Sequence, residues 1–275
     1  MSDFDGKIKI VLEEKNDKTI INELYHEGVS KISPTMHLDE EKIPCYFFMH
    51  LGGGYVEGES CSTYIELKEN TRSIITTQAP TLIYKSNNGN SCKQNSVIKL
   101  EKNSVLEYML DNTILFKDAI YEQKTDIYMD KDSTLIYTDG MTSGWSPDGE
   151  KFQYNLGHMK TRLFIDGEIK LMDNLILDAR NNDLGGFGFF EGYSNYGTAI
   201  IINRRINEKF VEKLREVVGE LNLDIDFGVS LLETNGLVIR VIGNLTQNIH
   251  KAIYTCTNYV RRELFNSCDL HLRKY

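Results

Sequence analysis

The stretch LGGGYVEGESCSTYIELKENTRSIITTQAPTLIYKS, residues 51–86, decides how this sequence folds. It begins with three adjacent glycines, which permit the positive φ angles or close backbone approach of a sharp bend or bulge. Runs of alternating apolar and polar residues follow and predict short β-strands, because successive strand side chains point to opposite faces. Thr76, Thr77 and Gln78 form a polar cluster within a strand that should be buried. The alternation predicts that Thr76 and Gln78 share one face and that Thr77 lies on the other.

The β pattern continues on both sides of this stretch. Polar turns follow every 8–12 residues, which is typical of a sandwich or a stack of sheets. No fixed repeat period is present, which argues against a solenoid. Hairpins are expected from the strand pairs 7–12 and 19–25, 95–100 and 104–110, 118–129 and 134–138, and 161–166 and 169–178.

The pattern changes at about residue 198. A buried strand is followed by a helix that Asn207 can cap, a hairpin from 225–232 and 237–242, and a helix that Thr246 can cap. We therefore expect a mainly β fold. A large multi-stranded β-sandwich or stacked-sheet body, residues 1–197, should carry a small α+β unit with two helices, residues 198–275, packed on it as one integrated domain. The expected apolar positions of the two helices are Ile206, Phe210, Leu214, Val217 and Leu221, then Ile249, Ile253, Cys256, Val260 and Leu264.

Composition excludes several classes of function. The net charge of −9 over 275 residues argues against nucleic acid or an anionic membrane as partner. The five cysteines form no CxxC pair, which disfavours a zinc ribbon or a redox motif. No apolar run approaches 18 residues, and the N-terminal segment lacks the pattern of a signal peptide, so we expect a cytoplasmic protein with reduced thiols. Neither a GxSxG elbow nor a Walker lysine is present.

Two segments are candidate partner-binding surfaces. The segment LGGFGFFEGYSNYG, residues 184–197, holds five glycines and five aromatic residues. Aromatic side chains are enriched at protein interfaces. The last helix carries adjacent arginines beside apolar residues. The expected partner contacts are Phe187, Phe189, Phe190, Tyr193, Arg261 and Arg262.

Four short motifs follow one another along the chain: Gly52-Gly53-Gly54 with Gly58-Glu59, Thr76-Thr77-Gln78 with Tyr84-Lys85-Ser86, Leu106-Glu107-Tyr108 with Phe116-Lys117-Asp118-Ala119, and Gly144 with Gly149-Glu150-Lys151-Phe152. In this order and spacing they resemble the family of urease accessory proteins called UreD, or UreH in some bacteria. The departures from the family pattern are Glu59 for an aspartate, Leu82 for a lysine, Leu110 and Leu115 for prolines, and Trp145 for an arginine.

The resemblance implies a non-catalytic role. Members of the family bind apo-urease and recruit an F-type accessory protein, which in turn docks a G-type GTPase. The assembly delivers nickel to urease, so no tightly bound cofactor is expected here, only transient Ni(II). By the same resemblance, Glu59, Asp139 and Asp173 are the predicted carboxylates of an internal passage. Thr76, Thr77 and Gln78 are its predicted polar lining.

Chemistry supports such a passage only in part, and two other functions stay open. Oxygen ligands hold Ni(II) less tightly than thiolates or imidazoles, which suits passing a metal on. One alternative is a cytoplasmic β-sandwich metal- or carbohydrate-active enzyme, which would need several of His50, His158, Glu59 and Glu150 to converge in one open pocket. The other is a protein-binding module without a metal path.

Overall fold

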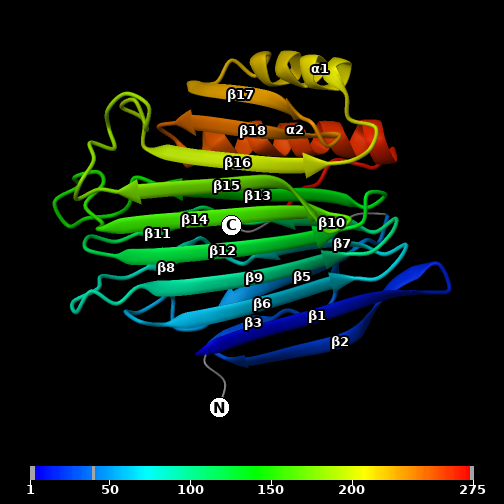
Figure 1. The fold of residues 1–275 in the computed structure, drawn as a ribbon, viewed down its shortest axis with the longest axis horizontal. Helices are drawn as coiled ribbons and strands as arrows, with labels where there is room; N and C mark the ends of the chain where they lie inside the picture. The colour runs from blue at the N-terminus through cyan, green and yellow to red at the C-terminus, as the bar shows by residue number, and fades with distance from the viewer. Residues whose placement is uncertain (1–3, 39–40, 273–275) are drawn as a thin grey trace.

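Two β-sheets lie face to face, and two helices accompany the larger sheet (Figure 1). The computed structural model describes residues 4–38 and 41–272. The smaller sheet has seven strands, in the spatial order β15 (Glu168–Asp178), β14 (Leu156–Ile165), β12 (Ile120–Met129), β9 (Cys92–Leu100), β6 (Ser60–Leu67), β1 (Gly6–Lys15) and β2 (Lys18–Gly28). The mainly β fold class is confirmed.

The larger sheet has eleven strands. Three short strands lie off its main path: β4 (Met36–His37), β8 (Thr81–Ile83) and β11 (Thr113–Leu115). The main path runs β17 (Ile225–Leu232), β18 (Gly236–Gly243), β16 (Asn195–Ile202), β13 (Thr134–Thr142), β10 (Val105–Met109), β7 (Arg72–Thr77), β5 (Pro44–His50) and β3 (Ser30–Ile32).

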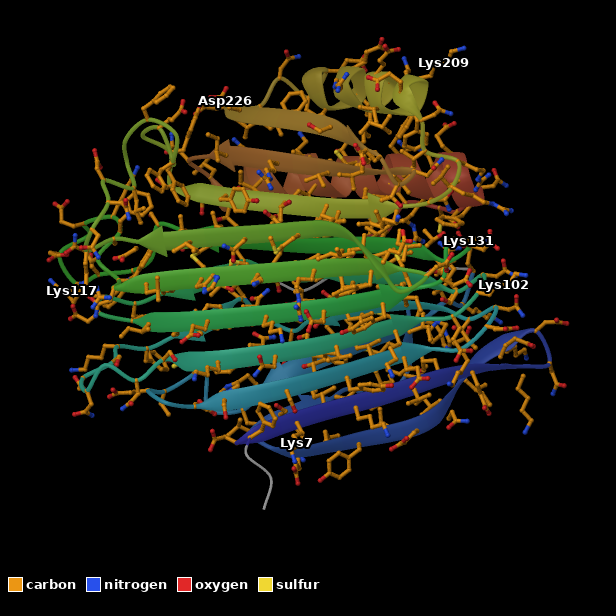
Figure 2. All side chains as sticks on the ribbon, viewed as in Figure 1. Lys7, Lys102, Lys117, Lys131, Lys209 and Asp226 are labelled. Atoms are coloured by element: carbon orange, nitrogen blue, oxygen red, sulfur yellow. The ribbon has the colours of Figure 1, made fainter. Side chains whose placement is uncertain are left out.

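Between β5 and β14 the chain winds back and forth from one sheet to the other. The strands β6, β9, β12 and β14 are parallel neighbours in the seven-stranded sheet, and β5, β7, β10 and β13 are parallel neighbours in the eleven-stranded sheet. The hairpins predicted for residues 95–110 and 118–138 are therefore wrong. Their turns carry the chain between sheets, and Lys102 and Lys131 mark those corners at one edge of the molecule (Figure 2).

This winding also corrects the expectation against a coiled repeat. The central coils differ in length because β8 and β11 are inserted into two of them, so no constant period marks the sequence. The predicted antiparallel hairpins β1–β2, β14–β15 and β17–β18 are confirmed.

The C-terminal segment extends the eleven-stranded sheet, since β16 pairs antiparallel with β13. Helix α1 (Glu208–Gly219) begins as predicted, with the Phe210 backbone N donating to Asn207 Oδ1 at 3.1 Å. Helix α2 (Thr246–Phe265) does not: its cap is Leu245, and Thr246 Oγ1 instead donates to Asn195 Oδ1 at 2.9 Å. Among the described residues, no helix combines the length and apolar character needed to cross a membrane.

Three hydrophobic clusters fill the fold. Two lie between the sheets, one around Ile10, Ile65 and Tyr137 and the other around Tyr121 and Met141. The third packs the outer face of the eleven-stranded sheet against α1 and α2. All five apolar positions predicted for α2 are buried there. In α1 the buried stripe is rotated and consists of Val211, Leu214 and Val218.

Close packing of α2 on β16 gives a stability prediction for Gly197. A Cβ there would lie 2.4 Å from Ile249 Cγ2 and 2.8 Å from Ile253 Cδ1. Overpacking of this kind costs about 1–3 kcal/mol, so Gly197→Ala should lower the free energy of unfolding by that amount in urea denaturation. Gly228→Ala, also in a strand but with no atom within 4 Å of the new Cβ, is the control. Equal stability of the two variants would contradict the packing argument.

Candidate functional site: a polar band between the sheets

A band of polar side chains separates the two hydrophobic clusters between the sheets. Along β6, Thr63 lies between Cys61 of one cluster and Ile65 of the other. Along β13, Asp139 is likewise flanked by Tyr137 and Met141. Parallel strands in register place equivalent positions side by side. The seven-stranded sheet consequently carries a row of buried hydroxyls across four strands, from Thr63, Ser96, Thr125 and Thr161.

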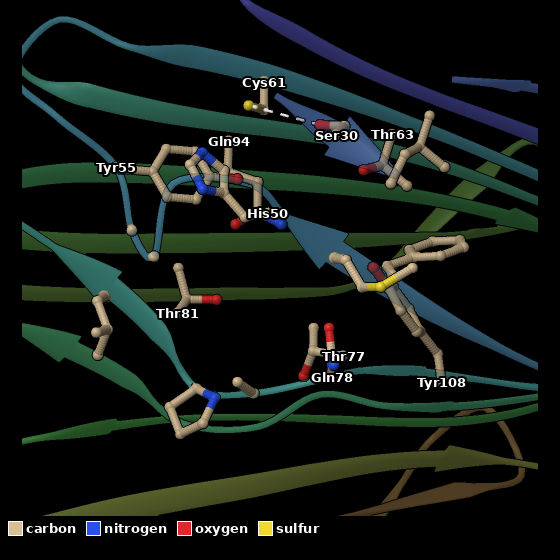
Figure 3. Close-up of a pocket in the computed structure, with 18 residues that line it drawn as sticks. Ser30, His50, Tyr55, Cys61, Thr63, Thr77, Gln78, Thr81, Gln94 and Tyr108 are labelled. Atoms are coloured by element: carbon tan, nitrogen blue, oxygen red, sulfur yellow. Dashed lines mark hydrogen bonds between the residues drawn. The ribbon is translucent and has the colours of Figure 1, made fainter. Parts of the chain in front are cut away.

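The band opens at one end into a cavity of about 210 Å³ (Figure 3). Predicted residues Thr77 and Gln78 line it, together with the strand-end residue His50. Figure 3 shows His50 and Tyr55 on one side of the cavity and Thr77 and Gln78 on the other. The remaining polar and sulfur-bearing lining residues are Ser30, Met49, Cys61, Thr63, Thr81, Gln94 and Tyr108.

Thr76 does not line this cavity, contrary to the prediction. Its side chain is fully buried, and its hydroxyl donates to the backbone oxygen of Met109. Its neighbour two residues earlier, Ile74, belongs to the cluster under the helices. Gln78 does not follow the strand's alternation of side chains between two faces, because β7 ends at Thr77.

Glu59 lies beside the cavity and is held by two contacts. Its Oε1 is 3.1 Å from His50 Nε2, and its Oε2 accepts a hydrogen bond from the Val56 backbone N at 2.9 Å. The carboxylate is 8% exposed. The ring of His50 stacks on that of Tyr55, with centroids 4.2 Å apart. Glu59 is therefore fixed next to an imidazole at the cavity wall.

A chain of hydrogen bonds leads from the cavity into the interior. The hydroxyl of Tyr121 lies 2.8 Å from Gln94 Oε1 and 2.9 Å from Gln123 Oε1. The amide of Gln123 in turn donates to Asp139 Oδ2. Tyr137 donates its hydroxyl to the same oxygen at 2.7 Å. Polar contacts thus connect the cavity with Asp139.

Asp139 is a buried carboxylate whose hydrogen-bond donors are neutral and whose charged neighbour is another carboxylate, Asp173. Burial raises its pKa to about 6, although hydrogen bonds from Tyr137, the Gly140 backbone N and Gln123 lower it. At neutral pH the carboxylate is consequently ionised. None of the described cationic side chains forms an ion pair with it. Burying a charge without an ionic partner is unfavourable.

Asp173 connects Asp139 with the opposite surface. The two carboxylates line a small void of about 10 Å³, together with Thr161 and Thr198. Beyond it, Asp173 lines an open groove of about 410 Å³ that also holds Asp226. Arg240 Nη2 donates to Asp173 Oδ1 at 2.8 Å. The three predicted carboxylates are therefore not one cluster, and they occupy the two ends and the middle of one polar band.

The predicted partner residues divide into exposed and buried sets. Phe187 is 94% exposed and Phe189 is 38% exposed, and Tyr193 is partly exposed. Phe190 is only 3% exposed and packs on Phe152, with ring centroids 4.8 Å apart. Phe190 is thus mainly a packing residue, although it also lines the groove that holds Asp226, and its role as a partner contact stays a prediction.

Of the two predicted docking arginines, only Arg262 reaches the surface. It forms an ion pair with Asp269. Arg261 has no exposed area, and its guanidinium is bound to Glu107. The prediction for Arg261 is therefore corrected: its contacts are within the fold.

The histidine–glutamate cluster of the enzyme alternative does not assemble. His50 and Glu59 are in contact, but His158 binds Asn174 at 2.8 Å. His158 is also next to the inward-facing Met159 on β14, so it lies on the outer face of its sheet. Glu150 is exposed in a loop. Of the four candidate residues, only His50 and Glu59 meet, and His158 and Glu150 lie elsewhere in the fold.

Several residues of the site were missed by sequence reasoning. Cys61, Gln94, Tyr121 and Gln123 come from three strands, and no local motif distinguishes them. Register is the signal that joins them, since Cys61, Gln94 and Gln123 are direct neighbours across β6, β9 and β12.

Fold and site together define the class: a two-sheet β protein whose interior presents carboxylates along a hydrogen-bonded band. A model of the family described as UreD urease accessory protein matches residues 5–273. The chain belongs to this family of urease accessory proteins, and the resemblance found in its motifs is confirmed. The family supports a role in urease maturation.

Individual relatives agree over their whole length. The urease accessory protein UreD of Streptococcus thermophilus is 37% identical over 271 residues, which cover 98% of this chain and 97% of the relative. That of Ureaplasma urealyticum is 38% identical, with 97% and 94% covered. That of Lachnoclostridium phytofermentans is 32% identical over 275 residues, with both chains fully covered.

Proposed function

We propose that this protein is a urease maturation factor that conveys Ni(II) toward the urease active site. It binds apo-urease and the F-type accessory protein, and the G-type GTPase docks through that F-type partner. The energy of GTP is used by the GTPase during metallocentre assembly. This chain is a scaffold and not an enzyme, and it holds Ni(II) only in passing.

Asp139 is the observation that carries the proposal. A carboxylate this deeply buried would normally have a cationic partner, and only neutral donors surround it. A divalent cation in the band would supply the missing charge. Because carboxylate, hydroxyl and amide oxygens bind Ni(II) weakly, the ion would not be retained there.

The band supplies the proposed route. Its hollows are the cavity beside Glu59, the void between Asp139 and Asp173, and the groove beyond Asp173. Side chains join the first hollow to the second, so Tyr121 and Gln123 must move when an ion passes. Both are held by hydrogen bonds to other side chains, which can be exchanged for bonds to a hydrated ion.

Partner contacts are proposed at the groove end of the band. Phe189 lines the groove, and the exposed Phe187 and the half-buried Tyr193 belong to the same loop. Arg262 stays the predicted contact on the last helix. Docking at this loop would place the partner over the exit beside Asp173.

The proposal is tested by nickel loading in cells. Urease subunits and the other accessory proteins are expressed with and without this chain, and urease-bound nickel is measured by mass spectrometry after purification. We expect nickel to be largely lost without the chain and restored by re-expression. Immunoblots confirm equal levels of the F-type and G-type proteins. Full nickel loading in cells that lack this chain would refute the proposal.

A further inference from the structure

At the wall of the cavity, three different metal ligands come together. His50 ends β5, Glu59 precedes β6, and Cys61 is the second residue of β6. One ligand atom from each lies within 4.8 Å of the others. We infer that His50, Glu59 and Cys61 form a binding site for Ni(II) where the polar band begins. The site serves the transit proposed above, on which this inference rests.

The ligand set differs from that of the rest of the band. Imidazole and thiolate are stronger ligands than oxygen for Ni(II), whereas Asp139 and Asp173 offer oxygen alone. A site with nitrogen, oxygen and sulfur can select Ni(II) from the Mg²⁺ and Ca²⁺ that oxygen ligands prefer. Selection at the entrance would decide which ion enters the band, and the weaker oxygen ligands further along would not retain it.

His50 has an unsatisfied nitrogen. Its Nε2 contacts Glu59, while its Nδ1 is buried without a hydrogen-bond partner among the described residues. Stacking on Tyr55 holds the ring in place. Buried polar atoms without partners are rare in folded proteins. Among the described residues, only the Glu59 contact therefore competes with a metal for this ring, and an ion between His50 and Glu59 would replace that contact.

Glu59 and Cys61 are held in positions that suit a shared ion. One oxygen of Glu59 is fixed by the Val56 backbone N, which leaves the other directed at His50. The Cys61 sulfur has two weakly interacting neighbours, Ser30 Oγ at 3.9 Å and the hydroxyl of Tyr55. When Ni(II) binds, the thiol loses its proton to solvent as the sulfur–nickel bond forms and coordinated water leaves.

Three protein ligands leave the ion open on the cavity side. His50 and Cys61 both line the cavity, as does Gln94, the first residue of the hydrogen-bonded chain. An ion with an open coordination position can exchange ligands, in contrast to the closed four-ligand structural sites. Figure 3 shows His50, Cys61 and Gln94 on the same side of the cavity.

The test is titration of the purified full-length protein with NiCl₂, followed by absorption spectroscopy. We expect one Ni(II) per chain with a sulfur-to-nickel charge-transfer band. Cys61→Ser should remove this band, and His50→Gln should weaken binding at least about tenfold, as loss of a ligand exceeds the effect of losing a supporting contact. Cys256→Ser, another buried thiol but in α2, is the matched control. Absorption from the exposed Cys268 would persist in the Cys61 variant and can be subtracted.

Each outcome decides the inference. Absence of the band in the wild type, or an unchanged band in Cys61→Ser, overturns it. Circular dichroism shows whether each variant is folded. If Cys61→Ser does not fold, the wild-type spectrum and the His50→Gln variant still test the inference. The proposed function fails separately, when urease is fully loaded in cells without this chain. A sulfur-ligated site in the purified protein would then still stand.

Discussion

Replacing Asp139 by asparagine is expected to lower urease activation at least about tenfold while the accessory complex still assembles. The variant has nearly the same shape and keeps an acceptor for the Gly140 backbone N. What it removes is the negative charge in the middle of the band. If the protein only binds its partners, that charge is dispensable and activation should be unchanged.

Electrostatics sets the size of the effect. Two unit charges 4 Å apart attract by about 4 kcal/mol at an effective dielectric constant of 20. If Asp139→Asn removes about a third of this attraction from the transition state for ion transfer, the transfer rate falls roughly tenfold. None of the described cationic side chains pairs with Asp139, so an ion would have no such partner to displace. Supplying excess nickel in the medium should partly restore activation, because a slower transfer is then offset by a higher concentration.

Asp126→Asn is the matched control for this experiment. Asp126 and Asp139 are both 6% exposed strand residues, but Asp126 pairs with Arg162 on the outer face of its sheet. Urease activity and co-purification of the F-type protein are measured in the same strains. Equal activation by the two variants would refute a role of Asp139 in transit. Loss of the complex in Asp139→Asn would assign its effect to assembly instead.

The parts of the fold that were predictable from sequence depend on local signals. Asn207 caps α1 as predicted because an Asn side chain reaches the backbone N–H three residues on. The buried stripe of α2 was likewise predictable, because the spacing of apolar residues along one helix is a local pattern. By contrast, residues at Lys102-Asn103 are compatible both with a hairpin and with a corner between two sheets. Only the pairing of β9 and β10 with other strands distinguishes the two.

The candidate site was predictable to a smaller extent. Thr77 and Gln78 line the cavity, and their role in a passage stays a prediction. Alternation placed Thr76 and Gln78 together because it assumed that the strand continued. Gln94, Gln123 and Asp139 are up to 45 residues apart in the sequence and meet only through strand register and the contact between sheets. Neither the strand register nor the contact between the sheets can be read from a local pattern of residues.

The adjacent arginines Arg261 and Arg262 lie in different environments. Arg262 points to solvent, while Arg261 is enclosed by α2 and the eleven-stranded sheet. Its Nη1 lies 2.6 Å and 2.5 Å from the two carboxylate oxygens of Glu107, which also has no exposed area. Arg72 Nη2 donates to the same carboxylate at 2.9 Å. Glu107 thus ties the last helix to β10 and β7.

Replacing Glu107 by glutamine should therefore cause a large loss of stability. Removing one partner of a buried ion pair leaves the other charge uncompensated and costs about 3–5 kcal/mol. We expect this loss in the free energy of unfolding, measured by urea denaturation of the purified chain. Arg262→Gln breaks only the exposed pair with Asp269, which is worth at most about 1 kcal/mol. A loss for Glu107→Gln as small as that of this control would mean that water or rearranged backbone groups satisfy Arg261, and that the helix is held on the sheet by its apolar stripe alone.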